Sequence, residues 1–268
     1  MTRLGRLGIA MVSVLVLLAV VGPWIAADPN AQPDPVGASL LLPSHSHWLG
    51  TDQLSRDIFA RLAAGARISL VVATIAVSVA AAIGSALGLA AGAVPGISGR
   101  LLQRLIDLGL ALPRIVVLLV VLAAVGRVHY PLLGVILGAT GWPAVARLVR
   151  GETLRLRHAQ YVTAAQALGA PSARVLWREI FPGTLPAVLV ASTLGLADAI
   201  LLEAGLSFIG VGVRPPDASW GGMLYDARDY ISSAPWLVFI PCVALVMATS
   251  AATLLGDALR RSLQPETR

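Results

Sequence analysis

The chain has 268 residues, of which 57% are hydrophobic and 13% charged, and its mean hydropathy of +0.80 is far above that of a water-soluble domain. This length accommodates about six membrane-spanning helices of ~20 residues and leaves no room for a second, enzymatic domain. The net charge is +6, and all 20 basic residues are arginine. Without lysine the chain cannot form the P-loop of an ATPase. A single cysteine, Cys242, excludes a disulfide or a cysteine-based zinc site within one chain.

Uncharged apolar runs of bilayer length predict an all-α, polytopic membrane protein. The first run follows Arg3 and Arg6, and we interpret it as an uncleaved anchor, with a cleaved signal peptide as the alternative. The second run is rich in small residues, so we expect it to lie inside the helix bundle. The predicted spans are residues 7–27, 68–99, 101–126, 128–146, the stretch after Pro182, and 231–256.

The distribution of arginine predicts that both termini are cytosolic, because basic loops are retained on that side of the membrane. With the N-terminus inside, thirteen of the twenty arginines fall in cytosolic segments. Two segments between spans are too long to be turns, an outer loop at 28–67 and an inner loop at 150–182. The predicted organisation is therefore an N-terminal helix (1–27), an extracytoplasmic loop (28–67), a core (68–262) and a C-terminal tail (263–268).

The inner loop contains a predicted short helix with one apolar stripe. The stripe consists of Tyr161, Ala164, Ala165 and Leu168, spaced i, i+3, i+4 and i+7. Gly169 can end this helix in the left-handed conformation, and a second helical stretch is expected to cap at Ser172 and to end at Pro182. The stripe suits the groove of another protein, or it packs beneath the chain's own helices; the pattern leaves both open.

Three motifs in order resemble one family of transport proteins. Residues 49–57 read LGTDQLSRD and lead to GARISL at 65–70, and residues 203–216 read EAGLSFIGVGVRPP and lead to SWG at 219–221. Between them, Thr163-Ala164-Ala165, Gly169 and Ile180-Phe181-Pro182 resemble the EAA loop of ABC importer permeases. Together they resemble the C-type permease subunit of dipeptide, oligopeptide and nickel ABC importers over residues 7–263. Thr163 replaces the glutamate that names the loop, and Phe181 replaces the usual leucine.

The resemblance implies the type I ABC importer permease fold in the bacterial cytoplasmic membrane, surrounded by lipid. It implies a B-type permease partner, ATPase subunits that bind ATP and Mg²⁺, and an extracytoplasmic peptide-binding protein. The residues implied to dock on the ATPase are Tyr161, Thr163, Ala164, Ala165, Leu168 and Gly169. The chain itself is then not an enzyme, and we expect no catalytic residue, metal, cofactor or nucleic acid on it.

The expected function is to form half of a translocation pathway for di- or oligopeptides. Import of nickel or another small solute by the same fold remains an alternative. A stand-alone secondary transporter is a further alternative, although the sequence has no internal repeat and few carboxylates within its spans. A membrane-embedded enzyme would need clustered His, Asp or Glu in the spans, and the sequence has no such cluster.

Ionised side chains inside a span cost about 2.5–3.5 kcal/mol, so they normally face a partner or water. We expect Asp107 to pair with Arg104 at i, i+3 spacing. Arg114, placed midway along the third span, and Asp198, in the fifth, are candidates for the translocation path. The sequence leaves three explanations open for these two charges: they pair with each other, they line an aqueous path, or they are exposed by chance.

Glu203 and Ser207 precede Pro215-Pro216 and are candidates for a gate at the outer end of the fifth span. The alternative for Glu203 is that it hydrogen-bonds backbone groups and braces the turn into the outer loop. His45 and His47 are too few ligands for a metal site and are expected to lie in a solvated loop.

Overall fold

The computed structural model describes residues 3–263 and confirms the all-α prediction. Within these residues the β-structure is a single isolated bridge between Thr51 and Asp57. Of the predicted tail at 263–268, only Leu263 lies inside the described residues. The helices are α1 (Arg3–Ile25), α2 (Ile58–Ala93), α3 (Ile97–Ala111), α4 (Arg114–Val125), α5 (Tyr130–Arg157), α6 (Gln160–Ala167), α7 (Ser172–Arg174), α8 (Phe181–Phe208), α9 (Trp220–Ala227) and α10 (Trp236–Leu263), with a π-helical turn η1 (Val175–Ile180) and a 3₁₀ turn η2 (Arg228–Tyr230).

Five helical segments are long and apolar enough to cross a membrane, and the pair α3–α4 makes a sixth if it is one broken span. The two helices of this pair are bent by 86°, so the third predicted span, at 101–126, consists of two helices that meet at a break. Pro113 has no backbone N–H and forces the preceding Leu112 into an extended conformation, which ends α3. Arg114 is therefore the first residue of α4 and does not lie midway along a helix.

The second span begins earlier than the apolar run indicates. Helix α2 starts at Ile58, not at residue 68, and the side chain of Asp57 caps it by accepting a hydrogen bond from the backbone N–H of Ala60 at 2.9 Å. The charge of Arg61 interrupts the apolar pattern, but its side chain is only 5% exposed and pairs with aspartates of other segments. The helix can therefore continue through it.

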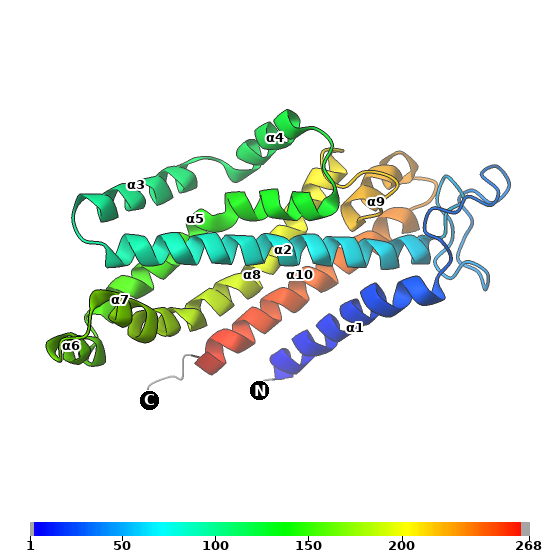
Figure 1. Cartoon of the computed structure of the whole chain (residues 1–268). Helices are drawn as coiled ribbons and strands as arrows, with labels where there is room; N and C mark the ends of the chain where they lie inside the picture. Colours follow the sequence, from blue (N-terminus) through cyan, green and yellow to red (C-terminus); the bar gives the residue numbers. More distant parts are fainter. Residues whose placement is uncertain (1–2, 264–268) are drawn as a thin grey trace.

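Helix α2 runs through the middle of the bundle and packs along α5, with α8 crossing beneath (Figure 1). Gly84, Gly88 and Gly92 face α5 so closely that a Cβ on Gly88 would lie 2.6 Å from the carbonyl oxygen of Ala146. Such small residues, one turn apart, let two helical backbones approach. This confirms that the second span lies inside the bundle.

The chain does not break at Pro182, contrary to the prediction. Helix α7, η1 and α8 form one apolar segment from Ser172 to Phe208. In η1 the backbone N–H of Phe181 donates to the carbonyl of Leu176, five residues back, and the segment continues through the next residue, Pro182, which has no N–H to donate. The N-cap is Pro171, one residue before the expected Ser172.

The two ends of the bundle differ. Figure 1 shows α6 and α7 at one end, with the start of α1 and the end of α10 toward the same side. The loop between α1 and α2 lies at the other end, together with α9. The inner loop and the outer loop of the sequence are thus at opposite ends of the molecule.

The close packing of α2 on α5 predicts that a side chain at Gly88 destabilises the fold. Gly88→Val forces the helices apart and should lower the free energy of unfolding by about 1–3 kcal/mol, measured by thermal unfolding in detergent. Gly151→Val is the matched control, because nothing lies within 4 Å of a Cβ at that helical glycine. Equal melting temperatures for the two variants would contradict the proposed packing role.

Candidate functional site

Helix α6 presents its apolar stripe to the outside of the molecule. Leu168 is 89% exposed and Tyr161 47% exposed, and Ala164 is also exposed. The contact with the chain's own core is made by Val162, which lies outside the stripe and is fully buried. Val162 belongs to a hydrophobic cluster with Leu156, Val175 and Ile180. Ala165 is half-buried, so most of the stripe, although not all of it, is left uncovered by the chain's own helices.

Gly169 fixes the direction in which the chain leaves α6. Its φ of +82° is in the left-handed region, as predicted. Its N–H donates to the carbonyl of Gln166, and the N–H of Ala170 donates to the carbonyl of Ala165, which together form a Schellman motif. The hydroxyl of Thr163 donates to the carbonyl of Gln160 at 2.9 Å, within the same helix.

Arg114 and Asp198 form an ion pair between α4 and α8, which confirms the pairing hypothesis. The guanidinium is also held by α5: its Nη2 donates to the carbonyl of Leu137 at 2.9 Å. Gly141 makes room for it, because a Cβ there would lie 2.8 Å from Nη2. The pair lines a cavity of about 170 Å³ between α2, α5 and α8.

The i, i+3 spacing predicted that Asp107 pairs with Arg104, and this prediction is wrong. Asp107 pairs with Arg147 of α5, at 3.1 Å. Helix α3 packs against α5, and this tertiary contact brings a residue 40 positions away nearer than the one a turn away. Both side chains of the pair remain more than half exposed. An exposed pair of this kind contributes little to stability.

The carboxylate of Glu203 is completely buried and accepts hydrogen bonds from hydroxyl groups rather than from the backbone. Ser69 of α2 and Ser207 of α8 each donate to it at 2.7 Å. The oxygen of Ser207 in turn accepts from the N–H of Val213 at 3.0 Å. This chain of bonds ties α2, the end of α8 and the segment after it together, and it leaves Glu203 and Ser207 with almost no exposed surface.

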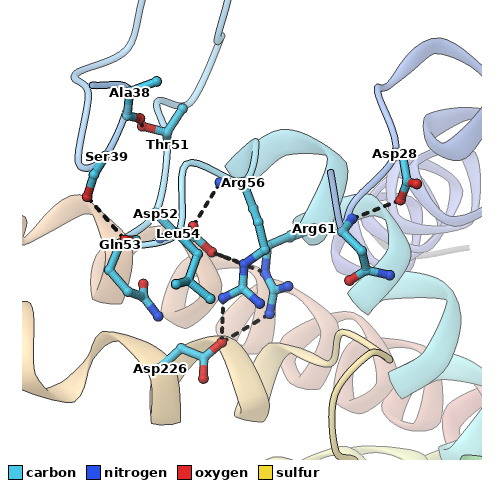
Figure 2. Close-up of polar contacts among 11 residues, drawn as sticks. Asp28, Ala38, Ser39, Thr51, Asp52, Gln53, Leu54, Arg56, Arg61 and Asp226 are labelled. Carbon is cyan, nitrogen blue, oxygen red and sulfur yellow. Dashed lines mark hydrogen bonds and ion pairs between the residues drawn. The ribbon is translucent and has the colours of Figure 1, made fainter. Parts of the chain in front are cut away.

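A charge network that was not predicted from the sequence lies at the end of the bundle that carries the α1–α2 loop. Figure 2 shows this network. Asp52 accepts from the Nε of Arg56 at 2.6 Å and lies 3.6 Å from Arg61. Both arginines also contact Asp226 of α9, at 2.9 and 3.1 Å. Two positive and two negative charges thus meet in a mostly buried site. In the sequence, the i, i+4 spacing of Asp52 and Arg56 was the one pattern that indicated any of these pairs.

The same network orders the loop before α2. The carboxylate of Asp52 accepts the backbone N–H groups of Leu54 and Arg56, each at 2.9 Å. Thr51 donates its hydroxyl to the carbonyl of Ala38, and Ser39 donates to the carbonyl of Gln53 (Figure 2). His47 pairs with Asp57 at 2.9 Å, and no group of three or more metal-ligating side chains occurs among residues 3–263.

Comparison with known proteins agrees with this architecture. Residues 84–268 match the family described as the binding-protein-dependent transport system inner membrane component. The chain is 35% identical to a dipeptide transport system permease protein of Alkalihalophilus pseudofirmus, over 99% of this chain and 87% of the relative. It is 32% identical to an oligopeptide transport system permease protein of Bacillus subtilis, over 99% and 87%, and 42% identical to a probable peptide ABC transporter permease of Sinorhizobium fredii, over 94% and 85%.

The charge network predicts that removal of the Asp226 carboxylate destabilises the fold much more than removal of the nearby Asp229 carboxylate. Asp226→Ala leaves Arg56 and Arg61 short of a partner in a buried site and should cost about 3 kcal/mol of stability. Asp229→Ala is the control, because Asp229 is exposed and its one ion pair within residues 3–263 is with the exposed Arg228. Thermal unfolding in detergent measures both; a melting temperature for Asp226→Ala within error of the control would show that the network adds no stability.

Proposed function

Because the chain belongs to the family of binding-protein-dependent transport system inner membrane components, we propose that it is a permease subunit of an ATP-driven importer of di- or oligopeptides. It is a multi-pass protein of the bacterial inner membrane. The observation that carries the proposal is its likeness, over 94–99% of its length, to permeases named for peptide transport. As such a subunit it forms half of the translocation pathway.

The chain needs a partner to supply energy. It has no lysine, so ATP and Mg²⁺ are bound by separate ATPase subunits and not by this chain. The exposed stripe of α6 supports docking on them, because a short helix with an apolar face fits a groove of another protein. The docking residues are Tyr161, Thr163, Ala164, Ala165, Leu168 and Gly169. The cytosolic end is then the end that carries α6, toward which the start of α1 and the end of α10 also lie.

A second, B-type permease covers the open side of α8. Only 11% of the most apolar window of the Ser172–Phe208 segment is buried within this chain, against 44% for α5. A helix that carries Asp198 and is so little covered needs protein or water beside it, because lipid does not solvate a carboxylate. The translocation pathway lies between the two permeases, and the remaining apolar surface faces lipid.

Transport follows alternating access. ATP binding moves α6 with the ATPase, and the continuous segment α7–η1–α8 carries this motion across the membrane. Glu203 and Ser207 brace the outer end of α8, so that the outer segment moves with it as a gate. An extracytoplasmic binding protein delivers peptide to the opposite end, where the Asp52–Arg56–Arg61–Asp226 network keeps the surface rigid.

Nickel or another small solute is the alternative cargo for the same fold. Uptake measurements on the complex, reconstituted in proteoliposomes with its binding protein, distinguish the two cargoes. We expect ATP-driven uptake of peptide and no uptake of nickel. A stand-alone secondary transporter is a second alternative. It predicts uptake by the purified chain alone, driven by an ion gradient and without ATP.

The proposed docking surface predicts that a charge in the apolar stripe releases the ATPase. Leu168→Asp should reduce the ATPase that co-purifies with the tagged chain at least about tenfold, because a buried leucine contributes about 1.5–3 kcal/mol to a contact. Gln166→Asp is the control, since this residue lies in the last turn of α6, next to Leu168 at the C-cap, and is exposed but lies outside the stripe. Equal recovery of ATPase with the two variants would exclude the stripe as the docking surface.

A further inference from the structure

We propose that Arg114 and Asp198 form a charge-paired binding site for the peptide's own termini, with Asp198 taking the ammonium group and Arg114 the carboxylate. This inference rests on the proposed function and names the part of the substrate that the pathway recognises. It is carried by the cavity at the pair, by the unequal anchoring of the two side chains, and by the position of Asp198 on the segment that α6 moves.

The pair lies at a depth where charge is costly. Asp198 is ten residues before the end of α8, which places it roughly 15 Å along the helix, near the middle of a ~30 Å hydrocarbon layer. Its side chain is nevertheless 58% exposed in this chain. An exposed carboxylate at this depth must face water or a polar ligand.

The cavity next to the pair has room for a small polar group. Its volume of about 170 Å³ equals that of roughly five water molecules. Apart from the two charged residues, most of its lining side chains are small, among them Ala76, Ala80, Gly141 and Ser192. Dipeptides of different sequence share two charged termini that lie close together, so a site with small walls and one charge of each sign can contact both termini of any dipeptide.

The two charges are anchored unequally, which allows the pair to open. Arg114 is fixed to α5 by the carbonyl of Leu137 and lies 3.5 Å from the hydroxyl of Thr140. Among the described residues, Asp198 receives a hydrogen bond from Arg114 alone. A carboxylate can accept about four hydrogen bonds, so most of its capacity is unused. When α8 moves, Arg114 stays with α5, and both charges become available.

A second ion pair, between α3 and α5, offers a comparison with the Arg114–Asp198 pair between α4 and α8. Asp107 and Arg147 are also paired, but both lie on open surface and neither borders the cavity. Their neutralisation removes a salt bridge of the same type without touching the proposed site. The pair is therefore a matched control.

The test uses the complex purified through a tag on this chain and reconstituted in proteoliposomes with its binding protein. Uptake of a radiolabelled dipeptide with free termini is measured per ATP hydrolysed. The double variant Arg114→Gln, Asp198→Asn leaves no unpaired charge, so a purely structural pair predicts normal uptake. A binding site predicts a loss of at least about tenfold, since hydrogen bonds to charged groups contribute about 1.5–3 kcal/mol. Asp107→Asn, Arg147→Gln should not change uptake.

A second measurement on the wild-type complex does not depend on the fold of a variant. A dipeptide with a diazirine side chain and free termini is photolysed during turnover, and we expect cross-links to residues that line the cavity, such as Ala144, Val145 and Ser192. Normal uptake by the double variant, or cross-links that avoid the cavity, would overturn the inference. Absence of ATP hydrolysis stimulated by the binding protein in the wild-type complex would instead overturn the proposed function.

Discussion

Every ionised side chain inside the apolar bundle must find a partner, because an isolated charge in the hydrocarbon layer costs several kcal/mol. This constraint explains contacts that hydropathy alone does not. Arg114 holds α4, α5 and α8 together through Asp198 and the Leu137 carbonyl. Glu203 joins α2 to α8 through two serine hydroxyls, one of them Ser69. The helices are thus oriented by a few polar contacts, while the close fit of glycine on α2 against α5 sets their spacing.

The continuity of the chain from α6 to Asp198 follows from local backbone chemistry. Gly169 turns the chain in the left-handed conformation, and the Schellman bonds fix that turn. The π-helical turn η1 then runs directly into α8, so the helical segment continues past Pro182. In the proposed importer, a displacement of α6 passes through the Gly169 turn into the continuous segment α7–η1–α8, which reaches the middle of the membrane at Asp198.

The sequence predicts features that depend on local pattern. The spans follow from apolar runs, the end of α6 from Gly169, and the Arg114–Asp198 pair from the cost of isolated charges. Contacts set by tertiary packing were not predictable in this way. Asp107 pairs with Arg147 and not with Arg104, which is closer in the sequence, because α3 packs on α5. Likewise, the early start of α2 depends on partners of Arg61 that are far away in the sequence.

The proposed transport cycle requires that nucleotide binding in the partner ATPase moves α8 relative to α4, which carries Arg114. Spin labels placed by Val120→Cys and Leu201→Cys, both at exposed positions, report this distance once Cys242, the one native cysteine, is replaced by serine. Double electron–electron resonance on the active complex should give different distance distributions in the nucleotide-free state and in the ATP state trapped with vanadate. If the distance distribution is the same in both states of a complex that hydrolyses ATP, α8 does not move relative to α4 and the proposed transport cycle is wrong.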